Sequence, residues 1–172
     1  MAGTPDCRRC PPPDRPFFPP VVSHGYKIPR SVLVVIYTAD LQVLMLERAG
    51  WPGFWQSVTG SIDHENEPLI ETAAREVREE TGIDAAQYRL TDWGIENNFE
   101  IFKKHRSRYA DGVTHNLEHI FGLELPGVVP VRLDPAEHLR YKWLPWKKAA
   151  ERTPSWTNRD AILLLPQKRG YG

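Results

Sequence analysis

The spacing of hydrophobic residues along the chain predicts strands and helices in alternation. Ser31–Tyr37 is a nearly all-apolar, β-branched run, as expected of a strand that is buried on both faces. Val43–Leu46 is a second apolar run, and the short segment Thr38–Asp40 that follows the first favours a hairpin. Further strands are predicted at Phe54–Thr59, Phe99–Phe102, Leu117–Leu125 and His138–Leu144.

The segment from Asn66 to Gly82 has the features of an amphipathic helix. Asn66 is a good N-cap, Pro68 is tolerated in the first turn, and Gly82 stands where many helices end. The apolar residues recur at spacings of three and four, so we expect one stripe to face a core while the glutamates take the other side. The stripe consists of Leu69, Ile70, Ala73, Ala74 and Val77.

The remaining segments complete a mixed architecture. A polar loop is predicted at Lys103–His115, a short helix at Trp146–Arg152, and a last helix that is capped by Ser155 and ends near Leu165. Helices interleaved with several strands favour an α/β (α+β) fold in which a mixed β-sheet is covered on both faces.

The two ends of the chain differ in character. Residues 1–22 are rich in proline and lack apolar periodicity, so we expect a disordered Pro-rich leader there. Cys7 and Cys10 lie in that leader, with no second CxxC or paired histidine to complete a zinc site. The rest, residues 23–172, has the length of one ordinary domain.

Composition narrows the possible partners. The 22 Lys and Arg residues balance the 22 Asp and Glu residues, so no overall field attracts the protein to DNA, RNA or an anionic membrane. We therefore expect a small-molecule ligand, with no nucleic-acid polymer and no membrane, while the oligomeric state stays open. No stretch approaches the roughly 20 consecutive apolar residues of a membrane span. Residues 1–22 also lack the apolar core of a signal peptide, so we expect a cytoplasmic location.

The predicted helix concentrates carboxylates on one face. Glu76 lies three residues before Glu79 and four before Glu80, and like charges at those spacings destabilise a helix. Arg75, four residues before Glu79, neutralises only part of this charge. A hard divalent cation such as Mg²⁺, with Mn²⁺ as a possible substitute, is the natural compensator, because it prefers carboxylate oxygens and bridges to phosphates. A solvated charged surface is the alternative.

A longer pattern distinguishes between these two interpretations. Gly60, Glu67, the pair Arg75-Glu76, the pair Glu79-Glu80 and Gly82 together resemble the Nudix box, with one extra residue between Gly60 and Glu67. The resemblance implies a Nudix-type α/β/α sandwich and a metal-dependent hydrolase that cuts a phosphoric anhydride bond. Its catalytic residues here would be Arg75, Glu76, Glu79 and Glu80.

The chain also resembles one bacterial branch of the Nudix family outside the box, over about residues 26–165. The segments that carry this similarity include Phe54–Ser61, Phe99–Phe102 and Glu137-His138-Leu139. That branch converts dihydroneopterin triphosphate to the monophosphate and pyrophosphate in folate biosynthesis.

The resemblance to this branch also implies site residues. Glu76, Glu80 and Glu137 would bind the metal. Substrate would be contacted by Lys27, Arg48, Thr59, Phe99, Glu100, Ile101, Phe102 and Ser155. The residue types fit: Lys and Arg suit phosphate oxygens, and two phenylalanines around Glu100 could stack on a pterin while Glu100 accepts hydrogen bonds from its donor-rich edge.

Other functions remain open at this point. The same chemistry fits a general nucleoside triphosphate pyrophosphatase acting on substrates such as dATP. A Nudix scaffold that binds a nucleotide without cutting it is the third option, but such scaffolds usually lack a box glutamate, and all three are present here. Phe99 and Phe102 could simply be core residues, Ser155 only an N-cap, and the histidines structural.

Overall fold

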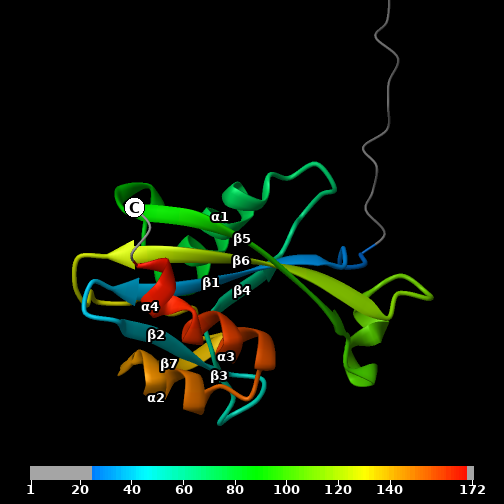
Figure 1. Cartoon of the computed structure of the whole chain (residues 1–172). Coiled ribbons are helices and arrows are strands. Elements are labelled where there is room, and N and C mark those ends of the chain that lie inside the picture. The colour runs from blue at the N-terminus through cyan, green and yellow to red at the C-terminus, as the bar shows by residue number, and fades with distance from the viewer. Residues whose placement is uncertain (1–24, 170–172) are drawn as a thin grey trace, which may run out of the picture.

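The computed structural model describes residues 25–169, and within them seven strands form one mixed sheet with helices on both faces (Figure 1). The leader predicted at residues 1–22 lies outside the described residues. The strands are β1 (Arg30–Thr38), β2 (Gln42–Arg48), β3 (Trp55–Gln56), β4 (Val58–Ser61), β5 (Arg89–Glu100), β6 (His115–Leu125) and β7 (His138–Pro145). The helices are α1 (Leu69–Thr81), α2 (Trp146–Arg152), α3 (Trp156–Leu163) and α4 (Leu165–Lys168), with 3₁₀ turns η1 (Ala85–Gln87) and η2 (Lys103–Arg108). None of the helices between residues 25 and 169 is long and apolar enough to cross a membrane.

Strand β1 is the centre of the sheet. It runs parallel to β6 along its whole length, whereas its other edge is shared by two antiparallel strands. β4 pairs with the first half of β1, and β2 joins it only at Tyr37↔Val43, as the predicted hairpin requires. The rest of β2 pairs with β3 and β7 and not with β1. The sheet therefore divides beside β1 into one branch formed by β4 and another formed by β2, β3 and β7.

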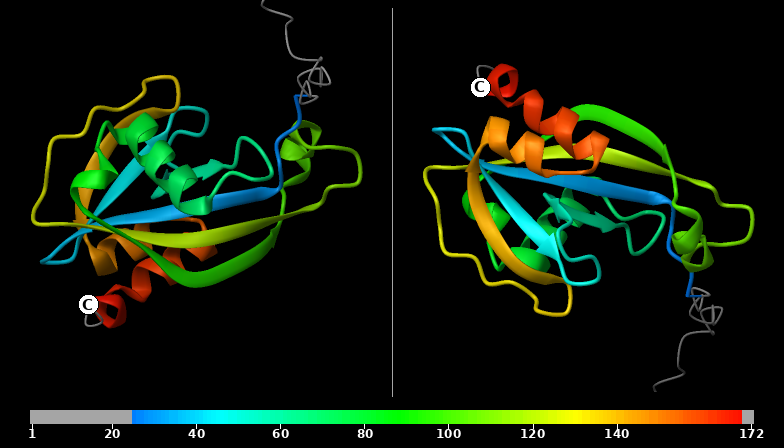
Figure 2. Two further views of the ribbon diagram at one scale, coloured as in Figure 1. Left: turned by 90° about the horizontal axis from the view of Figure 1, so that it is seen from above. Right: turned by 90° about the horizontal axis from the view of Figure 1, so that it is seen from below.

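The hydrophobic core has two layers because successive side chains of β1 point to opposite faces. Val32, Val34 and Ile36 pack toward α1, as one cluster with buried residues of that helix. Leu33, Val35 and Tyr37 face the other way, where α2, α3 and α4 cover the sheet. Figure 2 shows these two helical layers from opposite sides of the sheet. The predictions of a strand buried on both faces and of a mixed sheet with two helical layers are confirmed.

The predicted strand Phe54–Thr59 is in fact two strands, β3 and β4, which separate at Ser57. The backbone N–H of Ser57 donates to Oδ1 of Asn158 at 2.8 Å, and Nδ2 of Asn158 donates to the Ser57 hydroxyl at 2.8 Å. Both residues are fully buried. A side chain from α3 thus replaces the backbone partner that a continuous strand would have used.

Helix α1 departs from its predicted start but ends as predicted. Its N-cap is Pro68, with no side-chain cap, and Asn66 lies in the exposed loop before it, so the predicted Asn66 cap is wrong. Gly82 ends the helix with φ 72°, in the left-handed region that favours glycine. Ile70 is exposed although its spacing predicted a buried position, whereas Glu80 is buried although its charge predicted the outer side.

Three further boundaries differ from the predictions. β5 begins at Arg89, ten residues earlier than the predicted strand, and Ile101 and Phe102 lie beyond its end. An edge strand exposes much of its surface, so β5 needs no apolar run to form. The predicted loop Lys103–His115 contains η2, and its last residue already belongs to β6. The last helix is divided into α3 and α4, the second with proline in its first turn.

We predict that Asn158→Ala lowers the free energy of unfolding by about 1–3 kcal/mol, because it leaves the buried Ser57 N–H and hydroxyl without partners. Urea denaturation measures this change. Asn98→Ala, at an exposed position of β5, is the control and should shift the free energy by less than about 0.5 kcal/mol. Equal midpoints for wild type and Asn158→Ala would show that this side chain does not hold the break between β3 and β4.

Candidate active site

Arg75 connects helix α1 to the loop that precedes it. Its guanidinium donates to Glu67 Oε1 at 3.0 Å, to Glu76 Oε1 at 2.8 Å and to Glu79 Oε2 at 3.3 Å. It also donates to the backbone carbonyl of Ser61 at 3.0 Å. One cation therefore meets two of the three crowded carboxylates, Glu76 and Glu79, together with Glu67 of the preceding loop.

Glu67 closes the loop from its other end. Its Oε2 accepts from the backbone N–H of Asp63 at 2.5 Å, while its other oxygen is held by Arg75. Burial acts to raise the pKa of Glu67, but the bonds from Arg75 and Asp63 outweigh that effect and lower the pKa. The loop from Gly60 to Glu67, one residue longer than usual, is thus fixed by a buried carboxylate and not by an N-cap.

Glu76 lies directly against the backbone of Gly60. A Cβ atom placed on Gly60 would stand 1.8 Å from the carboxyl carbon of Glu76, so only glycine permits this approach. Burial raises the pKa of Glu76 to about 7, with Glu80 and Glu79 acting in the same direction and Arg75 against them. The Glu76 carboxylate is therefore short of positive charge even with its arginine partner.

Glu80, Glu137 and His138 form a compact group, in which one ligand atom from each lies within 4.8 Å of the others. Glu80 is only 3% exposed, and burial raises its pKa. Nε2 of His138, also buried, donates to Glu80 Oε2 at 3.0 Å, whereas Glu137 is exposed. A buried carboxylate beside an exposed one is a donor set that fits a hard divalent cation.

The start of β7 is irregular, and this irregularity brings Glu137 and His138 to Glu80. Arg48 of β2 pairs with His138 while Glu47 pairs with Arg140, so Leu139 is an extra residue in the ladder. The backbone N–H groups of Glu137 and His138 both donate to the carbonyl of Asp134, at 3.1 and 2.9 Å. Such bulges turn a side chain away from its regular direction and are common beside active sites.

Two basic residues face this acidic group. Lys27 is anchored by its backbone N–H, which donates to the Arg108 carbonyl at 2.7 Å. Desolvation lowers the pKa of Lys27, with Arg108 acting in the same direction and with Glu76 and Glu137 opposing it. Arg48 acts on the pKa of both Lys27 and Glu80. Lys27 and Arg48 therefore lie within electrostatic range of the glutamates, and their role as phosphate-binding residues stays a prediction.

The four residues Phe99–Phe102 do not form a single wall. Phe99 pairs with Asn116 and so faces the α3 side of the sheet, while Glu100, next along the strand, faces the opposite side. Glu100 is exposed and forms an ion pair with Arg106. Ile101 is buried, and Phe102 is 63% exposed, with its ring edge-on to Trp51 at 6.4 Å between centroids.

The other two predicted substrate residues lie on the α3 side of the sheet. Ser155 is the N-cap of α3, as predicted, because its hydroxyl accepts from the Asn158 backbone N–H at 3.4 Å. Thr59 of β4 accepts from Gln56 Nε2 at 3.1 Å. The predicted residues thus fall into three sets: a charged group around α1 and β7, an uncharged group of Thr59, Phe99 and Ser155 on the α3 side of the sheet, and the segment Glu100–Phe102 at the end of β5.

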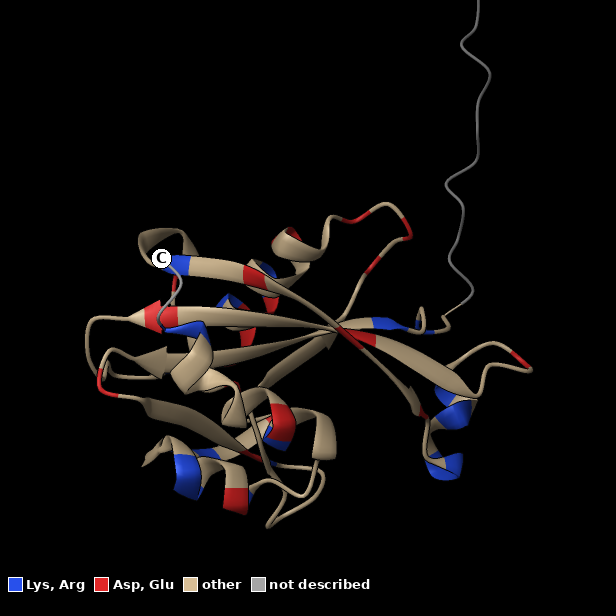
Figure 3. Cartoon of the chain, viewed as in Figure 1, with Lys and Arg blue, Asp and Glu red and all other residues tan. Residues whose placement is uncertain are grey.

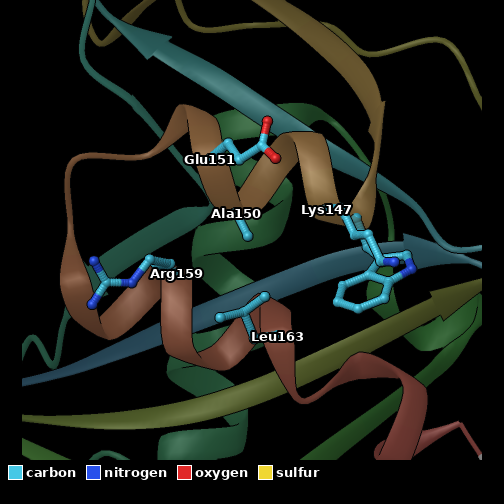
Figure 4. Close-up of a pocket in the computed structure, with 6 residues that line it drawn as sticks. Lys147, Ala150, Glu151, Arg159 and Leu163 are labelled. Atoms are coloured by element: carbon cyan, nitrogen blue, oxygen red, sulfur yellow. The ribbon is translucent and has the colours of Figure 1, made fainter.

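Acidic and basic residues are distributed unevenly over the fold (Figure 3). Acidic residues follow α1 and the loop before it, while Lys and Arg gather in η2, at the tip of the arm formed by β5 and β6. A shallow hollow also lies between α2 and α3 (Figure 4). None of the predicted site residues lines that hollow, so it is not the candidate site.

His138 is the residue at this site that sequence reasoning missed. The histidines were expected to be structural, yet the imidazole of His138 is part of the only His, Cys, Asp or Glu group of this kind within residues 25–169. Its position next to Glu137 in the Glu-His-Leu segment was the one available sign.

Comparison with known proteins agrees with the fold and with this geometry. Residues 27–165 match the NUDIX domain family. Dihydroneopterin triphosphate diphosphatase from Escherichia coli (strain K12) is 51% identical over 140 residues, which cover 80% of this chain and 91% of that protein. The Haemophilus influenzae protein of the same name is 45% identical over 141 residues, covering 80% of this chain and 87% of that protein.

Solved structures extend the comparison to three dimensions. The E. coli dihydroneopterin triphosphate pyrophosphohydrolase superposes with a TM-score of 0.74 at 51% identity, covering 80% of this chain and 94% of that one. The C. elegans Ap4A hydrolase in a binary complex shares the fold, with a TM-score of 0.64 at 19% identity over 82% of this chain and 97% of that one. With its box residues, sheet and helical layers all in place, this chain belongs to the Nudix hydrolase family.

Proposed function

We propose that this protein is a cytoplasmic, Mg²⁺-dependent pyrophosphohydrolase that converts dihydroneopterin triphosphate to dihydroneopterin monophosphate and pyrophosphate in folate biosynthesis. One observation carries the proposal: the buried Glu80 of α1 meets Glu137 and His138, within electrostatic range of Arg48 and close to Lys27. The identity with the E. coli and H. influenzae enzymes supports the choice of substrate. The domain responsible would be residues 23–172.

Glu76, Glu80 and Glu137 would hold the cation, which Mn²⁺ could replace. Bound there, the cation supplies positive charge that neutralises the polyphosphate and makes water more acidic. The raised pKa values of Glu76 and Glu80 support this assignment, because desolvated carboxylates of like charge need a cation to remain ionised together. Glu79 is mostly exposed and would contribute less directly.

The remaining residues would bind and orient the substrate. Lys27 and Arg48 would donate to phosphate oxygens, and Arg75 would hold Glu76 in place. Water adds to one phosphorus and gives up a proton to solvent, the P–O–P bond between the α- and β-phosphates breaks, and dihydroneopterin monophosphate and pyrophosphate separate. For the ring, we propose contacts with Thr59, Phe99, Phe102 and Ser155. Backbone contacts from Glu100 and Ile101 stay within this proposal, although the Glu100 side chain is already paired with Arg106.

The direct test is to incubate the purified protein with dihydroneopterin triphosphate, with and without Mg²⁺, and to identify both products. We expect Mg²⁺-dependent release of pyrophosphate and a higher kcat/KM than for dATP. A higher kcat/KM for dATP would replace this proposal by the general nucleoside triphosphate pyrophosphatase. Binding without cleavage would indicate the non-catalytic module.

Glu80→Gln should lower kcat at saturating Mg²⁺ by at least about 100-fold, because the charge of the carboxylate and not its shape holds the cation. Steady-state kinetics measure the effect. Glu71→Gln, at an exposed position in the first turn of the same helix, is the control and should retain wild-type kcat. A loss of less than about tenfold for Glu80→Gln, or about 1.4 kcal/mol, would contradict the metal assignment.

Gly60→Ala should weaken Mn²⁺ binding by roughly tenfold while leaving the fold intact, because the new methyl group displaces the Glu76 carboxylate and not the backbone. Electron paramagnetic resonance of free Mn²⁺ gives the Kd, and circular dichroism gives the Tm. Gly50→Ala is the matched control, since a Cβ there meets no atom within 4 Å. Equal Kd values for the two variants would mean that Glu76 does not bind the ion.

His138 is proposed as a positioning residue that donates to Glu80. His138→Leu, which removes the donor, should raise the Kd for Mn²⁺ by roughly 10- to 100-fold, and His138→Gln, which keeps an N–H donor, should restore much of the affinity. Circular dichroism gives the Tm of each variant, and both Kd values are measured below the lower Tm, so that a loss of affinity is not a loss of folded protein. Nitrogen coupling to bound Mn²⁺ in wild-type pulsed resonance spectra would instead identify His138 as a direct ligand.

A further inference from the structure

One row of the sheet carries polar side chains on four neighbouring strands, on the face that α3 covers. The pairings Ser61↔Ser31, Ser31↔Glu118 and Asn97↔Glu118 place these residues side by side across β4, β1, β6 and β5. The next row on that face is mostly apolar and consists of Thr59, Leu33, Ile120 and Ile95. The apolar layer therefore ends abruptly at Ser31, at the start of the central strand.

Two side chains at this border are buried and incompletely bonded. Glu118 is 5% exposed, Thr157 hydrogen-bonds its carboxyl group, and its Oε1 has no partner among the described residues. Asn116 lies two residues earlier on the same face and donates to the Ser31 hydroxyl at 2.7 Å, but its Oδ1 also lacks a partner there. Buried acceptors without donors cost free energy, so a donor from outside these residues is expected to meet them.

The position of these two acceptors connects them with the proposed ring-binding residues. Phe99 pairs with Asn116, and the Ser155 hydroxyl lies 3.1 Å from that of Thr157, which bonds Glu118. Burial also raises the pKa of Glu118 to about 7, as expected of a carboxyl group that lacks both solvent and a cation.

We propose that Glu118 and Asn116 recognise the 2-amino-4-oxopyrimidine edge of the substrate ring. That edge presents an amino group and an adjacent ring N–H, which are the donors that the two oxygens lack. Adenine has neither the 2-amino group nor the ring N–H at this edge. Both oxygens are shielded from solvent, so ring binding requires a local movement that opens a path to them. This inference rests on the proposed function, since it states which hydrogen-bond donors of the proposed substrate the site recognises.

Glu118 thereby takes the role that the sequence suggested for Glu100. Glu100 points to the other face of the arm, and its carboxylate already pairs with Arg106. Glu118 lies on the face that Phe99 and Ser155 share, and its open oxygen is buried, so a donor there gains more than it would at an exposed carboxylate.

The first experiment needs no variant. We compare dGTP and dITP as competitive inhibitors of dihydroneopterin triphosphate hydrolysis by the wild-type protein. dGTP carries the same edge, and dITP differs from it only by lacking the amino group. We expect an inhibition constant about tenfold lower for dGTP, because a buried acceptor left unpaired costs that much or more. Equal constants overturn the inference while leaving the proposed function intact. If the wild-type protein does not hydrolyse dihydroneopterin triphosphate, both the inference and the proposed function are wrong.

The second experiment uses Glu118→Leu, whose side chain has about the size of glutamate but carries no hydrogen-bond acceptor. Its kcat/KM for dihydroneopterin triphosphate should fall by about tenfold or more, and that for dATP by less than about threefold. Glu96→Gln, an exposed carboxylate on the opposite face of β5, is the control and should leave the ratio unchanged. Equal losses on both substrates, or a changed ratio in Glu100→Gln alone, contradict the inference.

Discussion

The ion-pair network around Arg75 is the interaction on which the rest of the site depends. Helix α1 carries carboxylates at spacings that repel, and of these Glu80 is buried away from water while Glu76 is half-buried. Arg75 binds Glu67, Glu76 and Glu79 together with a loop carbonyl, so the helix and its preceding loop become one unit. Yet one guanidinium cannot neutralise the whole group, and the pKa of Glu76 remains raised. A helix held in this way is stable enough to fold and still attracts a cation.

Because the sheet divides beside β1, two separate branches of it contact helix α1. β4 brings Gly60 against Glu76, whereas β2 and β7 diverge from β1 and bring the Glu137-His138 turn against Glu80. The two glutamates of one helix are thus met by different branches of one sheet. Neither branch alone would enclose the site.

The parts of the structure with local causes were predictable from the sequence. Helix α1, its end at Gly82 and the cap at Ser155 follow from residues close to one another in the chain, and the structure has all three. The glutamates were predictable because their spacing on a helix is a local property. The resemblance to the Nudix box extended this to the fold class.

The parts that sequence reasoning missed depend on distant contacts. His138 meets Glu80 across 58 positions, through a bulge that no local pattern announces. The break at Ser57 depends on Asn158, 101 positions away. β5 was mostly missed because an edge strand with polar residues such as Asn97 and Asn98 has no clear apolar alternation. In each case the missing information was which segments meet.

The parallel pairing of β1 with β6 has a consequence for how the chain folds. Ser31 and Asn116, which are bonded at the middle of the sheet, are separated by 85 positions in sequence. Closing so long a loop is entropically costly before any contact compensates it, so proteins built on such pairings fold slowly compared with those rich in local contacts. Helix α1 lies within that loop and can form early, but its glutamates acquire their partners on β4 and β7 only as the central strands come together. The group of Glu80, Glu137 and His138 therefore assembles only with the long-range contacts of the sheet.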